Sequence, residues 1–549
     1  MAVAASSERL FPTLTEAQIH RIAAHGRRRQ TTKGEVLVEI GDTAPFFVVV
    51  RGAIQVLSPT AGAETVIVTH GPGQFTGEAN MMTGRRSIAR SRVSEDGEVI
   101  QLDRSALLAL IQTDAELSAI LMRAFILRRT ELIAGGYGAV IIVGSAHSAG
   151  TLRVKEFLTR NGQPFRYIDL DRDREAQELL DEFHVSVDDI PVLICGATVL
   201  RNPTNQQIAD RLGFNEAIDR THVRDLVIVG AGPAGLAAAV YGASEGLDVL
   251  VLEAGSAGGQ AGTSSRIENY LGFPTGISGM DLTARAYAQA LKFGAEVMVA
   301  KGAVRLDCRS PLYGVGIGED ATLVARAVII ASGAEYRKPS IDNLRQFEGA
   351  GVYYAATQME AQLCAGEEVF IVGGGNSAGQ AAVFLASTAR RVHILVRKDG
   401  LAETMSRYLI RRIEESPSIQ LRPHCEIVAL EGDGRLERVQ WRDNKTGESE
   451  TSNIQHVFIM TGAVPNTVWL NRCVALDEKG FVKTGPDISK DELSNAGWSL
   501  TRPPYLLETS RPGVFAVGDV RAGNIKRVAS AVGEGSIAIS FVHRLLNAS

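Results

Sequence analysis

Short apolar runs separated by glycine turns dominate the first part of the chain, up to about Arg129. The runs KGEVLVEIGD, PFFVVVRGAIQVL, ETVIVTHGPGQF and GEVIQLD follow one another at regular spacing. Strands of this length and spacing predict a small β-barrel or β-roll. Apolar periodicity from Glu16 to Ala24 and from Ser105 to Arg128 predicts flanking helices. We therefore expect a first domain over residues 1–132.

A second pattern begins after the Gly135-Gly136 pair and alternates strands with helices. AVIIVGS, FRYIDLD and IPVLICG are apolar runs typical of strands, and the last opens at Pro191. TLRVKEFLTRNG predicts a helix that ends at an Asn-Gly cap, and EAQELLDEF predicts another. This order indicates an α/β domain over residues 137–218.

From Val223 onward, two units of strand, glycine turn and helix are nested. DLVIVGAGPAGLAAAV opens the outer unit, EVFIVGGGNSAGQAAVFL opens the inner unit, and RPGVFAVGDVRAGNIKRVASAVGEGSIAI closes the outer one. We expect two Rossmann-like dinucleotide-binding domains, the outer over 222–336 and 468–549 and the inner over 337–467. The fold class is thus a multidomain α/β and α+β chain.

The first glycine turn has the spacing of a dinucleotide-binding motif. Gly230 permits the tight turn, Gly232 lets the backbone approach a pyrophosphate, and Gly235 lets helix pack against strand. Amide groups at the new helix N-terminus would face the anion. Glu253 ends the second strand 18 residues after Gly235, where a carboxylate accepts hydrogen bonds from a ribose. Between these glycines the motif carries Pro233 and Ala234.

The inner glycine turn lacks the acid that follows the outer one. Its second strand, VHILVRK, ends in Arg397 and Lys398. Cations at this place pair with a 2′-phosphate, so we expect NADPH rather than NADH, although a solvated charge pair at a strand end is the alternative. The motif comprises Gly373, Gly375, Asn376, Ser377 and Ala378.

Length, charge and cysteine usage narrow the class of protein. A chain of 549 residues exceeds one hydrophobic core, and a net charge of −5 makes no case for nucleic acid or an anionic membrane as partner. The start MAVAASSERLFPTL lacks the features of a secretory signal, and glycines interrupt the apolar run from Leu226 to Tyr241. We therefore expect a cytoplasmic protein that does not span a membrane.

The five cysteines lie far apart and include no Cys-x-x-Cys pair. That usage suits a reducing compartment without structural disulfides, with most of the cysteines packed as small apolar residues. No His/Cys/Asp cluster suggests a metal site.

The segment that closes the outer unit indicates which class of dinucleotide-binding protein this chain resembles. Its strand VFAVGD ends at Gly518 and Asp519, and Ala331-Ser332-Gly333-Ala334 comes earlier. Together with GGQ, IENYLGF, TGAVPNT and GDVRAGNIKRVASAVGEG, this arrangement resembles the two-dinucleotide flavoprotein disulfide reductases, and among them low-molecular-weight thioredoxin reductase. The resemblance implies FAD and NADPH as cofactors, and we expect a homodimer. By position the flavin would meet Gly259, Gln260, Asn269, Gly333, Gly518, Asp519, Lys526, Arg527 and Val528.

The first domain resembles the cyclic-nucleotide-binding domain. In that family a glutamate binds the ribose 2′-hydroxyl group and an arginine binds the cyclic phosphate. The matching cassette here keeps Gly77, Glu78, Arg86 and Ser87, but the spacing from Glu78 to Arg86 is a residue or two shorter than usual. Binding of a cyclic nucleotide and a structural or docking role both stay open.

The second domain resembles the thioredoxin/glutaredoxin fold, in which a cis-proline precedes the third strand. Pro191 has that place, but the expected Cys-x-x-Cys falls on Ser148-Ala149-Gly150-Thr151. In the inner unit, alignment puts Ala355 and Gln358 at the two cysteine positions of thioredoxin reductase. Neither residue can exchange a disulfide, and Cys364 follows too late and lacks a resolving partner.

The missing sulfurs change the expected activity. What remains is a flavin reducible by NADPH with an external acceptor, as in ferredoxin–NADP reductases of the thioredoxin-reductase type. A quinone, dye, oxygen, disulfide or redox protein would need access only to the flavin, and we name no catalytic side chain. The alternatives are a nucleotide-sensing signalling flavoprotein, or a thioredoxin-disulfide reductase that uses cysteines paired only in space.

Overall fold

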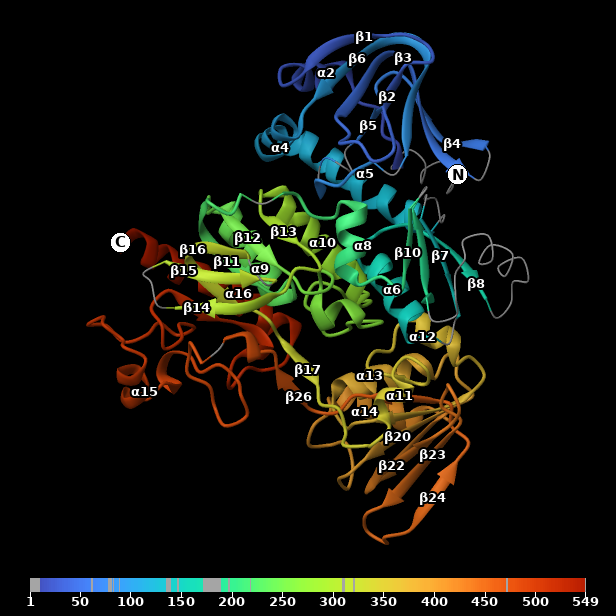
Figure 1. The fold of residues 1–549 in the computed structure, drawn as a ribbon, viewed down its shortest axis with the longest axis vertical. Coiled ribbons are helices and arrows are strands. Elements are labelled where there is room, and N and C mark those ends of the chain that lie inside the picture. The colour runs from blue at the N-terminus through green and yellow to red at the C-terminus, as the bar shows by residue number, and fades with distance from the viewer. Residues whose placement is uncertain are drawn as a thin grey trace.

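Figure 1 shows the chain as several packed bodies, with the N-terminal sheet at the top and the orange inner unit at the bottom. Parallel, antiparallel and mixed sheets occur together, so the expected mixed α/β class is confirmed. The computed structural model describes residues 10–60, 63–77, 81, 83–87, 89–134, 140–145, 148–170, 189–195, 198–217, 219–308, 312–318, 321–470 and 472–548.

The N-terminal unit (described residues 10–134) is a six-stranded antiparallel roll. Its order is β1-β6-β3-β4, with β2 on β6 and β5 on β3. Helix α2 (Glu16–Ala23) precedes the roll, and a core of aromatic and aliphatic side chains joins strands to helices. The strands are β1 (Arg27–Thr31), β2 (Val36–Val38), β3 (Phe46–Thr60), β4 (Ala63–His70), β5 (Phe75–Thr76) and β6 (Arg90–Leu102).

The single helix expected from Ser105 to Arg128 is wrong, because the segment forms two helices. α4 (Arg104–Thr113) ends at Asp114, which takes an extended conformation, and α5 (Ala115–Ala134) follows at once. The Asp114 carboxylate accepts from the backbone N of Leu117 at 3.0 Å and so caps the new helix. Apolar periodicity runs through the break and cannot locate it.

The middle unit (described residues 140–217) has a four-stranded sheet in the order β10-β9-β7-β8. β7 and β8 are parallel, whereas β9 and β10 run antiparallel to their neighbours. The Ile190–Pro191 peptide bond is cis, as expected. The predicted helix EAQELLDEF and the Gly135-Gly136 pair lie outside the described residues. The elements are β7 (Val140–Gly144), α6 (Ala149–Arg160), β8 (Arg166–Asp169), β9 (Val192–Cys195), β10 (Thr198–Arg201) and α8 (Asn205–Leu212).

The outer unit (described residues 219–336 and 468–548) contains a seven-stranded sheet. Its parallel part runs β13-β12-β11-β16-β27, and β15 and β14 continue antiparallel from β16. Helices cover one face, and the opposite face packs on the segment after the inner unit. The strands are β11 (Val223–Val229), β12 (Val249–Leu252), β13 (Glu296–Met298), β14 (Ala303–Asp307), β15 (Tyr313–Ile317), β16 (Ala321–Ile330) and β27 (Val514–Ala516). The helices are α9 (Pro233–Ser244), α10 (Gly279–Lys292), α15 (Lys490–Asn495) and α16 (Val528–Ala548).

The inner unit (337–467) has a parallel sheet in the order β18-β25-β19-β20-β21 and a three-stranded antiparallel sheet. The chain enters and leaves it through β17 (Ala334–Tyr336) and β26 (Ala463–Pro465), which pair with each other. The strands are β18 (Val352–Tyr353), β19 (Glu368–Val372), β20 (Arg391–Val396), β21 (Ile419–Pro423), β22 (Cys425–Glu431), β23 (Arg438–Asp443), β24 (Ser449–Ser452) and β25 (His456–Ile459). The helices are α11 (Leu344–Phe347), α12 (Gln358–Leu363), α13 (Asn376–Leu385) and α14 (Arg407–Glu415).

A disulfide between Cys308 and Cys473 contradicts the expectation of a chain without structural disulfides. The two cysteines are 165 residues apart because the inner unit is inserted between them. Cys308 follows β14, and Cys473 follows the 3₁₀ helix Val468–Leu470 that contacts this strand. Sequence spacing does not reveal a pair that only the nested topology creates.

Among the described residues, no single helix is long and apolar enough to cross a membrane. The bent pair of Arg104–Thr113 with Ala115–Arg128 meets the length and composition test only when both helices are counted together.

Candidate functional site

A cavity of about 1100 Å³ lies where the outer, inner and middle units meet. Most residues predicted for the flavin line its wall, together with two from the inner glycine turn. They are Gly230, Gly232, Pro233, Ala234, Glu253, Gly259, Gln260, Asn269, Gly333, Asn376, Ser377, Gly518, Asp519, Lys526, Arg527 and Val528. The fold therefore brings into one cavity residues that lie up to about 300 positions apart in the sequence.

The outer glycine turn has the geometry that a dinucleotide needs. Gly230 has φ +109°, and a Cβ there would lie 2.2 Å from the carbonyl oxygen of Ala331. A Cβ at Gly235 would lie 1.8 Å from the Gly230 oxygen, so this residue packs behind the turn rather than lining the cavity. Gly232 caps α9 without a side chain, which leaves the helix amide groups facing the cavity. The turn thus fits a pyrophosphate.

Glu253 holds the turn together at the end of β12. Its carboxylate accepts from the backbone N of Ala231 and from that of Gly255, each at 2.8 Å. Burial raises the pKa of Glu253, whereas these two bonds and the charge of Arg160 lower it. Its position beside the turn fits the ribose contact expected from the sequence.

The closing segment lies against the start of α9. Gly518 has φ +74°, and a Cβ there would lie 2.9 Å from the Ala234 Cβ. Glu534 accepts from the Gly518 backbone N at 2.7 Å and from Asn524 Nδ2 at 2.8 Å, which fixes the loop. Burial raises the pKa of Asp519. The predicted residues Lys526 and Arg527 are exposed at the rim.

Polar contacts fix the segment that links the outer and inner units. The Gln260 side chain donates to the carbonyl of Ala334 at the start of β17. Asn466 Nδ2 donates to the Ser332 oxygen at 3.0 Å, and the Ser332 hydroxyl donates to the Asn466 oxygen at 2.7 Å. These bonds hold Gly333, which has φ +67°, at the cavity wall.

The inner glycine turn has the same construction as the outer one. Gly373 has φ +143°, and a Cβ there would lie 2.4 Å from the Met460 oxygen. No heavy atom lies within 4 Å of a Cβ built on Gly375, which caps α13. Asn376 Oδ1 accepts from the Ser406 backbone N at 2.7 Å. Ala378 is fully buried and serves the helix-packing position.

The two predicted phosphate-binding cations stand at the end of β20, outside the cavity wall. Arg397 and Lys398 are both exposed. Lys398 Nζ lies 2.5 Å from the Glu403 carboxylate, whereas Arg397 has no ion-pair partner in the part of the chain that the structure describes. Arg397 is therefore the cation more available to a phosphate.

Sequence reasoning missed one wall of the cavity. One face of α6 in the middle unit lines it, and so do three tyrosines from β17 and the segment at β18. These residues are Ala149, Leu152, Arg153, Glu156, Arg160, Tyr336, Tyr353 and Tyr354. The spacing of the α6 residues marks one helix face, but nothing in the sequence says which domain that face meets.

The two positions where the family resemblance places redox cysteines lie at the cavity and beside it. Ala355 lines it, and Gln358 begins α12, where the Thr357 hydroxyl caps the helix. None of the five cysteines, all of which fall among the described residues, lines the cavity. Cys364 is fully buried, and burial raises its pKa to about 11. Its thiol is therefore protonated and packed at neutral pH.

The cyclic-nucleotide cassette lies at a junction of three units. Gly77 has φ +94°, Arg86 is exposed and donates to the Gly41 oxygen at 3.3 Å, and the Ser87 hydroxyl donates to the Ala89 oxygen. Glu78 lies outside the described residues.

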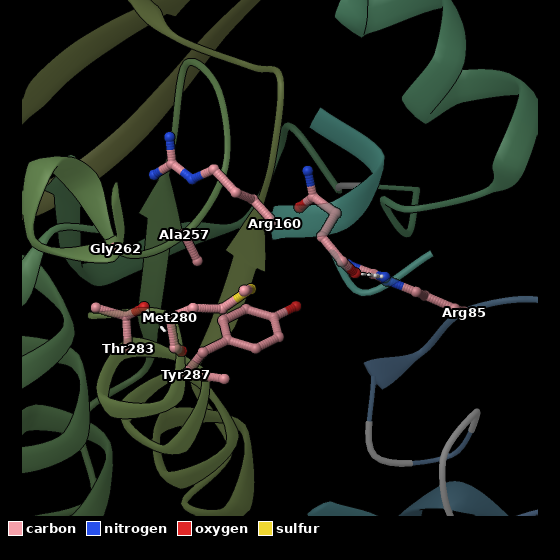
Figure 2. Close-up of a pocket in the computed structure, with 9 residues that line it drawn as sticks. Arg85, Arg160, Ala257, Gly262, Met280, Thr283 and Tyr287 are labelled. Atoms are coloured by element: carbon pink, nitrogen blue, oxygen red, sulfur yellow. Dashed lines mark hydrogen bonds between the residues drawn. The ribbon is translucent and has the colours of Figure 1, made fainter. Parts of the chain in front are cut away.

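The neighbouring Arg85 reaches the middle unit. It donates to the backbone oxygen of Asn161, and its guanidinium carbon lies 4.2 Å from the centre of the Phe214 ring. Figure 2 shows Arg85 and Tyr287 of α10 on two sides of a small pocket of about 20 Å³. The cassette is thus also an interdomain contact.

Comparisons with known proteins agree with this geometry. The family model described as pyridine nucleotide-disulphide oxidoreductase matches residues 224–535, and the cyclic nucleotide-binding domain matches residues 28–114. A thioredoxin reductase of Mycolicibacterium smegmatis is 34% identical over 317 residues, which cover 58% of this chain and 94% of that protein. One of Bacillus subtilis (strain 168) is 32% identical over 322 residues, with the same coverage.

A solved structure gives the same result. Thioredoxin reductase of Lactococcus lactis aligns with a TM-score of 0.53 and 27% identity, over 59% of this chain and all of that one. The chain therefore belongs to the pyridine nucleotide-disulphide oxidoreductase family, as a thioredoxin reductase-like enzyme whose family uses FAD and NADPH.

Proposed function

We propose that this enzyme passes electrons from NADPH through FAD to an acceptor outside the chain, without an internal dithiol. The observation that carries the proposal is the sulfur-free cavity wall, with Ala355 at the first dithiol position. A thiol–disulfide relay needs a thiolate beside the flavin, and Ala355 and Gln358 cannot supply one.

In this scheme the residues of the chain bind the two cofactors and orient them. The amide groups of the α9 N-terminus face the pyrophosphate, and Glu253 accepts hydrogen bonds from a ribose. FAD, when bound, supplies the redox chemistry. The inner turn with Arg397 and Lys398 selects NADPH by pairing with its 2′-phosphate. No side chain acts as acid, base or nucleophile in this scheme.

The acceptor is a small molecule or a redox protein that reaches the cavity. We propose that the protein is a cytoplasmic homodimer, because the resemblance to thioredoxin reductase favours both assignments. The Cys308–Cys473 disulfide removes cysteine usage as an argument for a reducing compartment.

One observation favours disulfide reduction as a second candidate. The pair Cys308–Cys473 exists in space although it has no sequence signature. Neither cysteine lines the cavity, so the pair would have to receive electrons from outside its wall.

Anaerobic stopped-flow spectroscopy with NADPH tests the main proposal. We expect the flavin absorbance to bleach within about a second and to return when an acceptor is added, in line with ordinary enzyme turnover. A bound flavin that stays oxidised under saturating NADPH contradicts the proposal and favours a sensing protein. Thioredoxin reduction that is lost in Cys308→Ser would establish the second candidate instead.

The N-terminal unit is proposed as the regulatory part, because its cassette both resembles a cyclic-nucleotide site and contacts the middle unit. Calorimetric titration of the full chain with cAMP and with cGMP tests this role. We expect saturable heat with one of them. Absence of heat and of a thermal shift with both would leave the cassette as a docking surface only.

A further inference from the structure

Helix α6 presents two different faces. Val154, Phe157 and Leu158 are buried in the core of the middle unit. The other face lies along the cavity, with the spacing of three and four residues that puts side chains on one side of a helix. Its members are Ala149, Leu152, Arg153, Glu156 and Arg160. The middle unit, which lies outside the residues matched by the family model, therefore contributes a wall to the cavity.

Arg160 makes the contact at the outer-unit end of this face. Its Nη2 donates to the Gly259 oxygen at 2.9 Å and to the Ser256 oxygen at 3.3 Å. Next to it, Asn161 Nδ2 donates to the Ser256 hydroxyl at 2.8 Å, and Asn161 is only 2% exposed. Figure 2 shows the Arg160 side chain extending toward the segment that carries Ala257 and Gly262. Arg160 of α6 and the cap residue Asn161 thus hold one loop of the outer unit in place.

That loop, residues 256–259, faces the dinucleotide turn. Gly258 N donates to the Ala231 oxygen at 2.8 Å, and a Cβ built on Gly259 would lie 3.0 Å from the Gly232 Cα. Gly232 is where the backbone approaches a pyrophosphate. A shift of the loop would therefore move one wall of the pyrophosphate site.

The charge of Arg160 is incompletely satisfied by protein groups. Its side chain is 19% exposed, and its Nη1 lies 3.3 Å from the Glu156 carboxylate. Its Nε is buried and has no hydrogen-bond partner among the described residues. Arg160 lines the cavity, so its charge is available to an anionic group bound there. Arg160 also acts electrostatically on Glu253, which places its charge beside the ribose position.

We propose that Arg160 is an FAD-binding residue supplied by the middle unit. It holds loop 256–259 against the dinucleotide and adds positive charge beside the pyrophosphate and adenosine half. The inference rests on FAD as the cofactor of the family. It gives the middle unit, which lacks a Cys-x-x-Cys, a role in building the flavin site.

Titration of the deflavinated full chain with FAD, followed by flavin fluorescence, tests this role. Charge-assisted hydrogen bonds contribute about 1.5–3 kcal/mol, so we expect Arg160→Ala to raise the Kd for FAD roughly 10- to 100-fold. Arg160→Lys should recover part of the affinity, and Arg160→Gln should lose the salt dependence of binding. The matched control is Arg211→Ala, an exposed arginine of α8 that does not line the cavity.

The outcomes separate this role from the cofactor assignment and from a purely structural effect. An Arg160→Gln chain whose Kd and salt dependence equal those of the unsubstituted protein overturns the proposal, while tight FAD binding keeps the cofactor. A fall in the melting temperature of the FAD-free Arg160→Ala chain with no change in its Kd for FAD overturns it too, because the residue would then only support the fold. If the unsubstituted chain binds no FAD, both the proposed function and this inference fail.

Discussion

Arg397 stands exposed at the end of β20, and we propose that it binds the 2′-phosphate of the nicotinamide cofactor. Its neighbour Lys398 already pairs with Glu403. We expect Arg397→Ala to raise the KM for NADPH roughly 10- to 100-fold with little effect on the KM for NADH, because a charged hydrogen bond to the 2′-phosphate is lost. Steady-state kinetics with both cofactors measures this difference.

The control for that substitution lies on the same strand. Arg391→Ala removes an exposed arginine from the opposite end of β20 and should leave both KM values unchanged. Equal loss with NADPH and NADH in Arg397→Ala would mean that the side chain does not read the phosphate.

Two glycines of the dinucleotide turns should respond differently to the same substitution. Gly235→Ala forces a Cβ to within 1.8 Å of the Gly230 oxygen, so we expect a lower melting temperature and lost FAD, at a cost of about 1–3 kcal/mol or more. Gly375→Ala meets no atom within 4 Å, and its φ of −92° suits alanine. We expect it to keep the melting temperature and to raise the KM for NADPH about tenfold, because the methyl group enters phosphate space. An unchanged KM would place the phosphates elsewhere.

At the scale of elements, the cysteine pair joins the end of β14 to the segment after the 3₁₀ helix Val468–Leu470. The bond closes a loop of 165 residues. A disulfide that closes a long loop adds about 2–5 kcal/mol to the free energy of unfolding. We expect the double variant Cys308→Ser with Cys473→Ser to unfold at lower denaturant concentration while NADPH still reduces the flavin.

The unsubstituted protein treated with reductant is the control for the double variant, and the two should unfold alike. A double variant that loses flavin reduction as well as stability would show that the pair takes part in electron transfer. Equal stability before and after reduction would mean that the bond does not form in solution.

Two helices show which features apolar periodicity can locate and which it cannot. α6 was predicted by its pattern, and its apolar positions do form the core of the middle unit. The polar positions Arg153, Glu156 and Arg160 resemble an ordinary solvated face, yet they line the cavity. The break at Asp114 escaped prediction for the same reason, since a helix pattern continues on both sides of it.

At the scale of the whole molecule, Arg85 connects the N-terminal unit to the two units that meet at the small pocket. It contacts Asn161 and Phe214, and burial lowers its pKa. We expect Arg85→Ala to destabilise this junction by about 1–3 kcal/mol, because a partly buried hydrogen bond donated by a charged group and a ring contact disappear. Faster hydrogen exchange in α8 and α10 would report the loosened contact.

The exposed neighbour Arg86 offers the comparison. It donates one long hydrogen bond to Gly41, and its side chain lies beside Gly213 at the end of α8. Arg86→Ala should therefore speed exchange in α8 less than Arg85→Ala does and leave the exchange rate of α10 unchanged. If Arg86→Ala abolishes cyclic-nucleotide binding while Arg85→Ala does not, then Arg86 binds the ligand and Arg85 serves the contact between units. If hydrogen exchange in α8 and α10 is as slow in the Arg85→Ala chain as in the unsubstituted protein, Arg85 does not stabilise the junction.

The sequence by itself determined the features that depend on local geometry. The glycine turns at Gly230 and Gly373 and the acid at Glu253 follow from what a strand, a tight turn and a helix N-terminus require. Each of these lies where the pattern predicts, because backbone conformation and amide direction are set by a few neighbouring residues. The sequence alone also shows alanine and glutamine at Ala355 and Gln358, the positions where the resemblance predicts the two redox cysteines.

Only the tertiary structure decided which distant groups meet. The Cys308–Cys473 pair joins two parts of the outer unit, and Arg160 and Arg85 each contact another unit, at loop 256–259 and at the middle unit respectively. Such contacts depend on how whole units pack, and packing leaves no fixed spacing in the sequence. A side chain that looks solvated on its own helix becomes part of a site once another unit covers it.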